Sequence, residues 1–291
     1  MTIMPIIDTH LHFWDLALYR YPWLEHPSAA SSRVTYKPAD WARDHEGLDI
    51  RGAVHVQAEL DRDLDPVLET AWLKSVWGDC SIPLVHIAHT NPAAVDLEDV
   101  LARHMAHGIV RGIRDVAWFH PTAENMQRRN PLENPAWVAG LRRLISRNLS
   151  FDLLVYPSQL DQSRSVFRGM QELTVIIEHC GLPHAIGSDE RKHWRNALRR
   201  FAHEVPMAFL KISGMSLLNY VWSASGLRDH VSECIEIFGV DRCMFGSNFP
   251  IEKATIDYKA LWQTYSDVTT AFTERERSQL FWKTAAAVYG F

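Results

Sequence analysis

Residues 5–12 of the chain read Pro5-Ile6-Ile7-Asp8-Thr9-His10-Leu11-His12, a short apolar run that ends in two histidines. Side chains alternate between the two faces of an extended strand, so His10 and His12 are expected on the same face. Asp8 shares that face and can orient one imidazole ring by accepting its second N–H group. Two adjacent imidazoles at the C-terminal end of a strand predict a site for a metal ion or a polarised carbonyl group.

Seven further apolar runs follow this strand, and the eight together cover residues 6–8, 53–57, 83–89, 109–114, 151–156, 174–179, 208–213 and 242–247. Near-continuous apolar runs are typical of parallel strands that are buried on both faces. Between most of them lie stretches with helical spacing of apolar residues, over residues 67–76, 96–107, 135–148, 159–171, 191–204 and 227–238. This alternation predicts an α/β fold, a (β/α)8 TIM barrel that forms a single domain over residues 1–291. An open, doubly wound sheet is the alternative.

The composition is that of an ordinary globular protein of 291 residues with a formal net charge of −5. Lysines and arginines are scattered, so the expected partner is a small-molecule substrate, without nucleic acid or membrane. No apolar run approaches the ~20 residues of a transmembrane helix, and the first residues lack a signal-peptide pattern. The four cysteines form no CxxC pair, which favours a cytoplasmic protein with reduced thiols. The sequence leaves open whether the protein forms a homo-oligomer.

Two long connections interrupt the alternation of strands and helices. Residues 13–40 follow the first strand and residues 117–134 follow the fourth, and both are rich in aromatic side chains. In a barrel, loops that follow strands build the active site. We expect both connections to be packed lids over that site.

Polar side chains lie at the predicted C-terminal ends of the strands, where a barrel carries its active site. The candidates are His10, His12, His55, Gln57, Arg111, Arg114, Tyr156, His179 and Asn248. Of these, Arg114, His55, Gln57, Arg111 and Tyr156 are predicted to bind substrate, since an arginine in a cleft suits a carboxylate group. Three structural interpretations stand beside these predictions. At least one of His86 and His89 points into the barrel wall, Cys180 packs in the core, and Lys211 pairs with an acid.

Five segments resemble, in order, landmarks of the amidohydrolase-2 family of the amidohydrolase superfamily. They are Ile7-Asp8-Thr9-His10-Leu11-His12-Phe13-Trp14-Asp15, Gly112-Ile113-Arg114, Ile177-Glu178-His179-Cys180-Gly181-Leu182-Pro183, Leu210-Lys211-Ile212-Ser213-Gly214 and Met244-Phe245-Gly246-Ser247-Asn248-Phe249-Pro250. The resemblance spans nearly the whole chain. Within the family it points to the TIM-barrel lactonase group, which includes 2-pyrone-4,6-dicarboxylate and sugar-lactone lactonases.

The resemblance implies a (β/α)8 barrel and assigns roles to four residues. His10, His12 and His179 would bind a divalent metal ion or polarise the substrate carbonyl. Arg114 would hold an anionic or polyhydroxylated part of the substrate. The implied reaction is the opening of a small carboxylated or sugar-derived lactone by water. The alternatives are a non-oxidative decarboxylase and a catalytically silent protein that binds a small ligand.

Asn248 departs from the family pattern. The last motif of the family usually reads Gly-Ser-Asp-Trp-Pro, and its Asp is the general base, whereas this chain has Gly246-Ser247-Asn248-Phe249-Pro250. A neutral amide cannot take up a proton at neutral pH and binds metal ions more weakly than a carboxylate. The histidines therefore favour a divalent metal, zinc first, while Asn248 favours a metal-free site. The open candidates for the base are His179, His10, His12, Glu252 and Glu59, and Asn248 itself could donate to an oxyanion.

Overall fold

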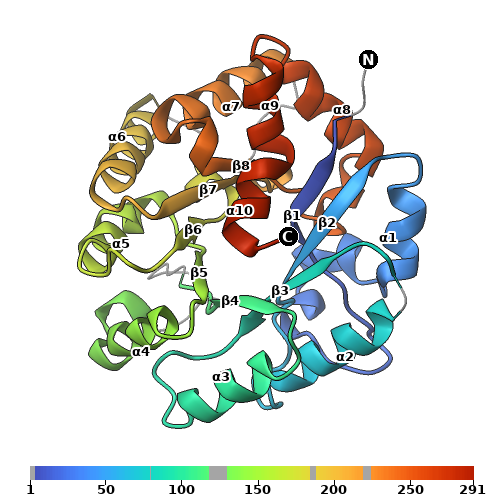
Figure 1. Ribbon diagram of the computed structural model, residues 1–291, viewed down its shortest axis with the longest axis vertical. Coiled ribbons are helices and arrows are strands. Elements are labelled where there is room, and N and C mark those ends of the chain that lie inside the picture. Colours follow the sequence, from blue (N-terminus) through green and yellow to red (C-terminus); the bar gives the residue numbers. More distant parts are fainter. Residues whose placement is uncertain (1–3, 79, 118–129, 184–187, 219–223) are drawn as a thin grey trace.

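Eight parallel strands, paired in chain order from first to last, form one sheet that curves into a barrel (Figure 1). They are β1 (Ile6–Leu11), β2 (Ile50–Val56), β3 (Leu84–His89), β4 (Val110–Arg114), β5 (Ser150–Leu153), β6 (Val175–Ile177), β7 (Ala208–Ile212) and β8 (Cys243–Phe245). The computed structural model describes residues 4–78, 80–117, 130–183, 188–218 and 224–291. The predicted (β/α)8 barrel is confirmed. A doubly wound sheet is wrong, because its strand order would reverse at a switch point.

Helices cover the outside of the barrel between successive strands. They are α1 (Pro38–Asp44), α2 (Val67–Trp77), α3 (Leu97–Met105), α4 (Pro135–Ile145), α5 (Leu160–Phe167), α6 (Ser188–Glu204), α7 (Ala224–Phe238) and α8 (Tyr258–Val268), followed by α9 (Glu274–Ser278) and α10 (Thr284–Tyr289). Helical spacing did not predict α1, α8, α9 or α10, of which α1, α9 and α10 have at most seven residues. Within the described ranges, no helix is long and apolar enough to cross a membrane.

The barrel is closed by backbone hydrogen bonds between β1 and the segment after β8. The N–H of His12 donates to the carbonyl of Phe249 over 2.7 Å, and the N–H of Asn248 donates to the carbonyl of His10 over 2.6 Å. A Cβ atom at position 246 would lie 2.7 Å from the Cβ of His10. Gly246 is therefore required by the close approach of the first and last strands.

We call the contact between β1 and the segment after β8 the seam. Asp8 is buried in the seam and holds it together. Its carboxylate accepts the N–H of Ser247 at 2.8 Å and the hydroxyl of Tyr258 at 2.8 Å, besides the backbone N–H of His10 at 3.2 Å. The expectation that Asp8 orients a histidine ring is therefore wrong. Its oxygens are satisfied by two backbone groups and by a tyrosine of α8.

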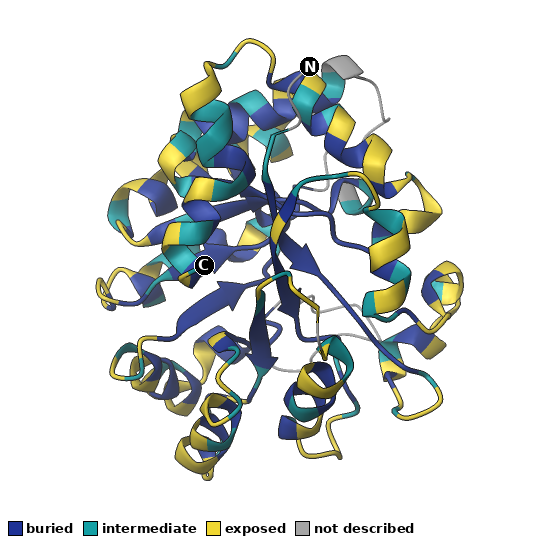
Figure 2. Cartoon of the chain, turned by 45° about the vertical axis from the view of Figure 1, so that its right-hand side comes forward, coloured by how far each residue is buried: buried dark blue, intermediate teal, exposed yellow. Residues whose placement is uncertain are grey.

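The interior of the barrel is apolar near the N-terminal ends of its strands. Ile7, Val54, Val56, Val85, Ile87, Ile176 and Met244 form one buried cluster with Tyr289 of α10. The last helix covers the N-terminal ends of the strands, where the ring of Phe291 lies so near Gly52 that a Cβ there would come within 2.7 Å (Figure 1). The strands are buried, while the surrounding helices bury one side and expose the other (Figure 2). The histidines lie at the opposite, C-terminal end of the barrel.

The aromatic connection after β1 is packed, as predicted. Trp14 exchanges backbone hydrogen bonds with Tyr36 at 2.9 and 3.0 Å, and its indole N–H donates to the carbonyl of Val34 at 2.6 Å. Tyr21 and Leu24 pack with Trp14 in a separate buried cluster. For the second predicted lid, residues 118–129 lie outside the described residues.

The hydrogen bond from the Tyr258 hydroxyl to Asp8 is expected to stabilise the protein. We expect Tyr258→Phe to lower the free energy of unfolding by about 1–3 kcal/mol, because a buried carboxylate loses a donor. Tyr289→Phe is the matched control, since the buried hydroxyl of Tyr289 has no hydrogen-bond partner among the described residues. Urea denaturation measures both. Equal effects of the two substitutions would contradict this role of the seam.

Candidate active site

His10 and His12 lie together at the C-terminal end of β1, as their spacing predicted. Their Nε2 atoms are 3.1 Å apart, and the two residues are 0% and 4% exposed. Burial lowers the pKa of both rings well below the ordinary value, and the positive charge of Arg114 adds to this effect. Both rings are therefore neutral at pH 7, the form in which histidine binds metal ions.

A hydrogen bond fixes the tautomer of His12. Its Nδ1 lies 2.7 Å from the carbonyl oxygen of Val56. A carbonyl oxygen only accepts, so Nδ1 of His12 must carry the proton. The Nε2 atom of the neutral ring then has only a lone pair, and it presents that lone pair to His10.

His10 lies between two acceptors. Its Nε2 faces the lone pair of His12 at 3.1 Å, and its Nδ1 lies 3.4 Å from Oε1 of Glu178. Arg114 donates to the other oxygen of Glu178 over 3.0 Å and so favours the ionised carboxylate. A neutral imidazole has one N–H and can satisfy only one of the two acceptors. One additional positive charge, such as that of a metal ion, would resolve the conflict.

The donor atoms around His10 fit a divalent cation. Tetrahedral zinc with Zn–N bonds of 2.0–2.1 Å separates two nitrogen ligands by roughly 3.3 Å, close to the observed 3.1 Å. Ligand atoms of His10, Glu178 and His179 all lie within 4.8 Å of one another. Buried acceptors at Oε1 of Glu178 and Oδ1 of Asn248 have no hydrogen-bond partner in the described part of the chain.

His179 comes from a left-handed turn that follows β6. The φ angles of residues 179–182 are 50°, 57°, 72° and 47°. This turn brings the His179 ring to 4.4 Å from the His10 ring, with Nδ1 at 2.9 Å from the Ser213 hydroxyl. Gly214 leaves room for it, since a Cβ there would lie 2.5 Å from Nδ1 of His179. Burial lowers the pKa of His179 to about 4, and Arg114 contributes to the decrease.

Glu252 fixes the orientation of the Asn248 amide. Nδ2 of Asn248 donates to Glu252 at 3.3 Å, and the same carboxylate accepts the hydroxyl and the N–H of Ser216 at 2.7 and 3.0 Å. A carboxylate accepts and does not donate, so the NH2 group must face Glu252 and Oδ1 must face away. Asn248 thus presents an acceptor to its surroundings, which disfavours the role of oxyanion donor. The three bonds to Glu252 disfavour that residue as the base.

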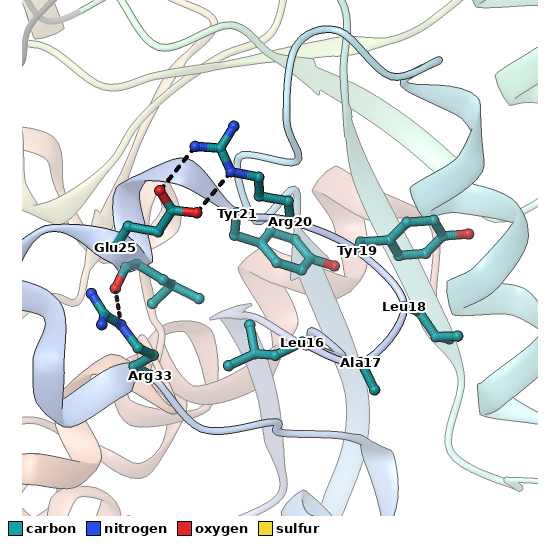
Figure 3. A pocket seen from close by; sticks show the side chains of 9 residues that line it. Leu16, Ala17, Leu18, Tyr19, Arg20, Tyr21, Glu25 and Arg33 are labelled. Atoms are coloured by element: carbon teal, nitrogen blue, oxygen red, sulfur yellow. Dashed lines mark hydrogen bonds and ion pairs between the residues drawn. The ribbon is translucent and has the colours of Figure 1, made fainter.

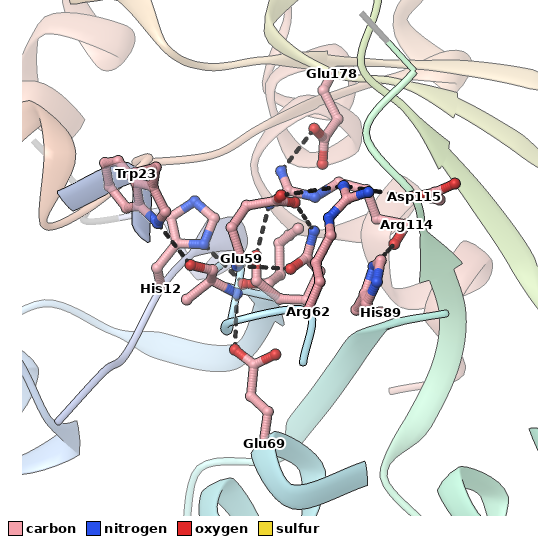
Figure 4. Close-up of polar contacts among 12 residues, drawn as sticks. His12, Trp23, Glu59, Arg62, Glu69, His89, Arg114, Asp115 and Glu178 are labelled. Carbon is pink, nitrogen blue, oxygen red and sulfur yellow. Dashed lines mark hydrogen bonds and ion pairs between the residues drawn. The ribbon is translucent and has the colours of Figure 1, made fainter. Parts of the chain in front are cut away.

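A charged network lies beside the histidines (Figure 4). Arg114 contacts Glu178 at 3.0 Å and Glu59 at 4.0 Å, and Arg62 contacts Glu59 at 3.6 Å and Asp115 at 3.7 Å. Burial alone would lower the pKa of Arg114, but Glu178 and Glu59 outweigh it and raise that pKa. Three carboxylates and two guanidinium groups give the network a formal charge of −1.

Arg114 and Gln57 lie in this network, where the sequence placed them. One terminal nitrogen of Arg114 donates to the carbonyl of Gln57 at 2.6 Å, and the other donates to Glu178. The Gln57 side chain bonds to Glu59, whose N–H donates back to Gln57 at 2.7 Å. Substrate binding by Arg114 and Gln57 stays a prediction, since both are already engaged within the protein.

His55 and Arg111, both predicted to bind substrate, are engaged elsewhere in the fold, although the His55 ring centroid lies 6.4 Å from that of His12. His55 faces α2, with Nε2 at 3.3 Å from Glu69, because the neighbouring Val54 and Val56 face the barrel interior. Arg111 is exposed at the opposite end of β4, where it donates to the carbonyls of Gly108 and Val110 at 3.1 and 3.0 Å. Arg111 does not lie at the C-terminal end of its strand as predicted, and substrate binding by either residue stays a prediction. A short apolar run shows neither which side chains of a strand face inward nor where along the strand a residue lies.

His86, Cys180 and Lys211 follow their structural interpretations, whereas substrate binding by Tyr156 stays a prediction. Tyr156 packs beside the apolar cluster of Val116, Leu154 and Leu182, next to the turn after β6. His86 is buried in the barrel wall, Cys180 is buried in the main core, and Lys211 pairs with Asp152 at 2.5 Å. Glu178 is the site residue that the sequence did not single out. Its only signal was an acid directly before His179 at the end of a strand.

The connection at residues 13–40 lies over the histidines. The Trp14 ring is 6.3 Å from the His12 ring, and Trp23 packs edge-on against Trp14 at 5.6 Å. A cavity of about 410 Å³ opens within this connection itself, beside the Arg20–Glu25 ion pair (Figure 3). It is lined by Leu16, Ala17, Leu18, Tyr19, Arg20, Tyr21, Leu24, Glu25 and Arg33. None of the site histidines lines it, so we place the reaction at the histidines and not in this cavity.

Comparison with known sequences identifies the class of protein. The model of the Amidohydrolase family matches residues 7–291. The chain therefore belongs to the amidohydrolase family. It is 33% identical to the uncharacterized protein y4mH of Sinorhizobium fredii over 99% of both chains. It is 27% identical to an L-fucono-1,5-lactonase of Burkholderia multivorans over 97% of this chain and 95% of that protein.

Solved structures share the fold. An amidohydrolase from Burkholderia multivorans with bound zinc superposes with a TM-score of 0.83 at 23% identity, over 98% of this chain and 99% of that one. A 2,6-dihydroxybenzoate decarboxylase superposes with a TM-score of 0.68 at 10% identity over the whole of both chains. An amidohydrolase and a decarboxylase thus share this barrel fold. The fold alone therefore does not identify the reaction, which must be argued from the site.

Acid is expected to destabilise the protein through its buried histidines. The pKa of His179 is about 4 in the fold, against ~6.5 in an unfolded chain. Because the unfolded chain binds this proton more tightly, the free energy of unfolding falls as the pH drops from about 6.5 to about 4. The loss for His179 alone is about 3 kcal/mol. Urea denaturation in EDTA across this range should show a smaller pH slope for His179→Gln. Its control, His203→Gln at an exposed position, should keep the wild-type slope, and equal slopes in all three proteins would contradict the prediction.

The Asn248–Glu252 contact predicts coupled substitutions. Asn248→Asp would put a second buried carboxylate where Nδ2 now lies 3.3 Å from Glu252. Like charges at that distance disfavour ionisation of both, so we expect a loss of at least about 1 kcal/mol in chelated protein. Glu252→Gln in the same chain should restore most of it. A double-mutant cycle by urea denaturation tests this, and additive effects would refute the coupling.

Proposed function

We propose that this amidohydrolase hydrolyses a small hydroxylated lactone of the sugar-acid type. The observation that carries the proposal is the missing positive charge at His10, which lies between two acceptors and has one proton. A site that takes up a cation beside neutral imidazoles is suited to polarise a carbonyl group. The 27% identity to an L-fucono-1,5-lactonase supports a sugar lactone as the substrate.

A divalent cation, zinc first, fits this role. His10 and His12 would hold it through their Nε2 atoms, with His179 and Oδ1 of Asn248 as further donors. When bound, it would supply Lewis-acid polarisation of the lactone carbonyl. Glu178 would then accept the Nδ1 proton of His10 and orient that ring, while Ser213 orients His179.

Glu59 is our candidate for the base. Burial would raise the pKa of Glu59, but Arg114, His89 and Arg62 outweigh burial and lower it, so the carboxylate is ionised at neutral pH. Its side chain is 28% exposed, and Figure 4 shows it on the same side of the barrel as His12. Glu59 would take a proton from the attacking water and return one to the ring oxygen as the C–O bond breaks. The product is a hydroxy acid, which releases one proton at neutral pH.

The charge of the site favours a neutral substrate over a carboxylated one. The network of Glu178, Arg114, Glu59, Arg62 and Asp115 carries a formal charge of −1, and its two arginines are paired with acids. An anionic lactone would have to be attracted by a bound cation alone. Hydroxyl groups can instead use the carboxylates and amides of the network as hydrogen-bond partners.

Proton release from a panel of lactones tests the proposal. We expect hydrolysis of sugar lactones, followed with a pH indicator, with little activity on dicarboxylated lactones. Glu59→Gln should lower kcat by about 10²–10⁴-fold, the typical contribution of a general base. His12→Gln should abolish hydrolysis. His203→Gln, at an exposed position in the last turn of α6, should leave it unchanged.

The same assay distinguishes the role of the cation and the competing reactions. Activity that is lost in EDTA and restored by zinc would support the metal site. Activity that survives EDTA would contradict the metal site. The lactonase proposal would be refuted by an absence of proton release from every lactone. Release of carbon dioxide from aromatic acids in its place would identify a decarboxylase.

A further inference from the structure

Three of the four cysteines of the chain come together in the layer between the barrel and α7. Cys180 follows His179 in the left-handed turn, Cys234 lies in α7, and Cys243 begins β8. His230, four residues before Cys234, lies on the same side of α7. All four side chains are 0% exposed. The proposed hydrolysis uses none of them.

The spacing of these side chains suits a metal ion. Ligand atoms of Cys180, His230 and Cys234 all lie within 4.8 Å of one another, and Sγ of Cys234 is 3.8 Å from Nε2 of His230. Tetrahedral zinc with Zn–S bonds of 2.3 Å and Zn–N bonds of 2.0–2.1 Å separates S and N ligands by roughly 3.6 Å. Small side-chain movements would therefore complete the coordination. Two thiolates and an imidazole are soft donors that select zinc over magnesium or calcium.

The turn that holds Cys180 needs such an anchor. Three of its four left-handed residues, His179, Cys180 and Leu182, are not glycine, and this conformation is unfavourable for residues with a Cβ atom. From α6, the indole N–H of Trp194 holds the carbonyl of Cys180 at 2.8 Å. The thiol of Cys180 lies 3.8 Å from the carbonyl oxygen of Lys211, and its sulfur is within 4.8 Å of the ligand atoms of His230 and Cys234 in α7.

We propose that Cys180, His230 and Cys234 bind a thiophilic metal ion of the zinc class, and that this ion anchors the turn that carries Glu178 and His179. Each thiol that binds the ion releases one proton. Cys243 lies nearby, with its thiol 3.8 Å from the carbonyl oxygen of Cys234. The site is distinct from the one around His10, because its ligands come from the helix side of the sheet.

Cobalt(II) is the probe that tests the proposal, because thiolate ligands give a charge-transfer absorption in the near ultraviolet that histidine and oxygen ligands do not. The full-length protein is stripped with EDTA and titrated with cobalt chloride. We expect the thiolate band in wild type and in His12→Gln, and its loss in Cys234→Ser. Cys80→Ser, which removes the exposed cysteine, should keep the band. Cobalt binding without the band, or a band lost in Cys80→Ser and kept in Cys234→Ser, would overturn the proposal.

A second measurement covers the case in which Cys234→Ser does not fold. His230→Gln keeps all thiols and should weaken cobalt binding at the thiolate site by at least about 10-fold. In wild type, zinc should protect two thiols from a disulfide reagent under conditions where EDTA-treated protein reacts. Zinc should also change the fluorescence of Trp194, whose ring lies 5.3 Å from that of His230. Unchanged thiol reactivity with and without zinc would overturn the proposal.

Discussion

His10 has a single proton and two acceptors, and the chemistry of the site depends on this imbalance. Its neighbours His12 and Glu178 do not relieve it. The proton of His12 belongs to the carbonyl of Val56, and Arg114 holds Glu178 in its ionised form. The amide of Asn248 is turned by Glu252 so that only its oxygen is available. The lone pair of His12 and the carboxylate of Glu178 therefore both face His10, which has one proton to share between them.

The barrel makes this arrangement possible by bringing distant strands into close contact. Glycines at 214 and 246 remove side chains where His179 and His10 need space. The seam through Asp8 fixes the height at which β1 meets the segment after β8. Below the site, apolar side chains and α10 fill the barrel, so water has little access to the polar groups from that end. Electrostatic interactions are stronger in such a setting than at an open surface.

The sequence was sufficient for the fold and for the centre of the site, because both depend on local patterns. Apolar runs show buried strands, and the spacing of His10 and His12 shows which side chains share a face. The contacts of His55 and Arg111 were not predicted, because a short run does not reveal where its strand begins or which phase faces inward. The role of Asp8 depends on Ser247, which is 239 residues away, and the engagement of Arg114 depends on Glu178. Such contacts arise from closure of the barrel and have no local signature.

Because the seam joins β1 to the segment after β8, the candidate site can form only after that segment has been synthesised. His10 leaves the ribosome well before its hydrogen-bonded neighbour Asn248. At typical rates of 5–20 residues per second, Ser247 follows Asp8, 239 residues earlier, by about 10–50 s. For that interval the two histidines exist without the last strand that positions them. A nascent or truncated chain therefore lacks the closed site, and the formation of that site reports that the whole barrel has been completed.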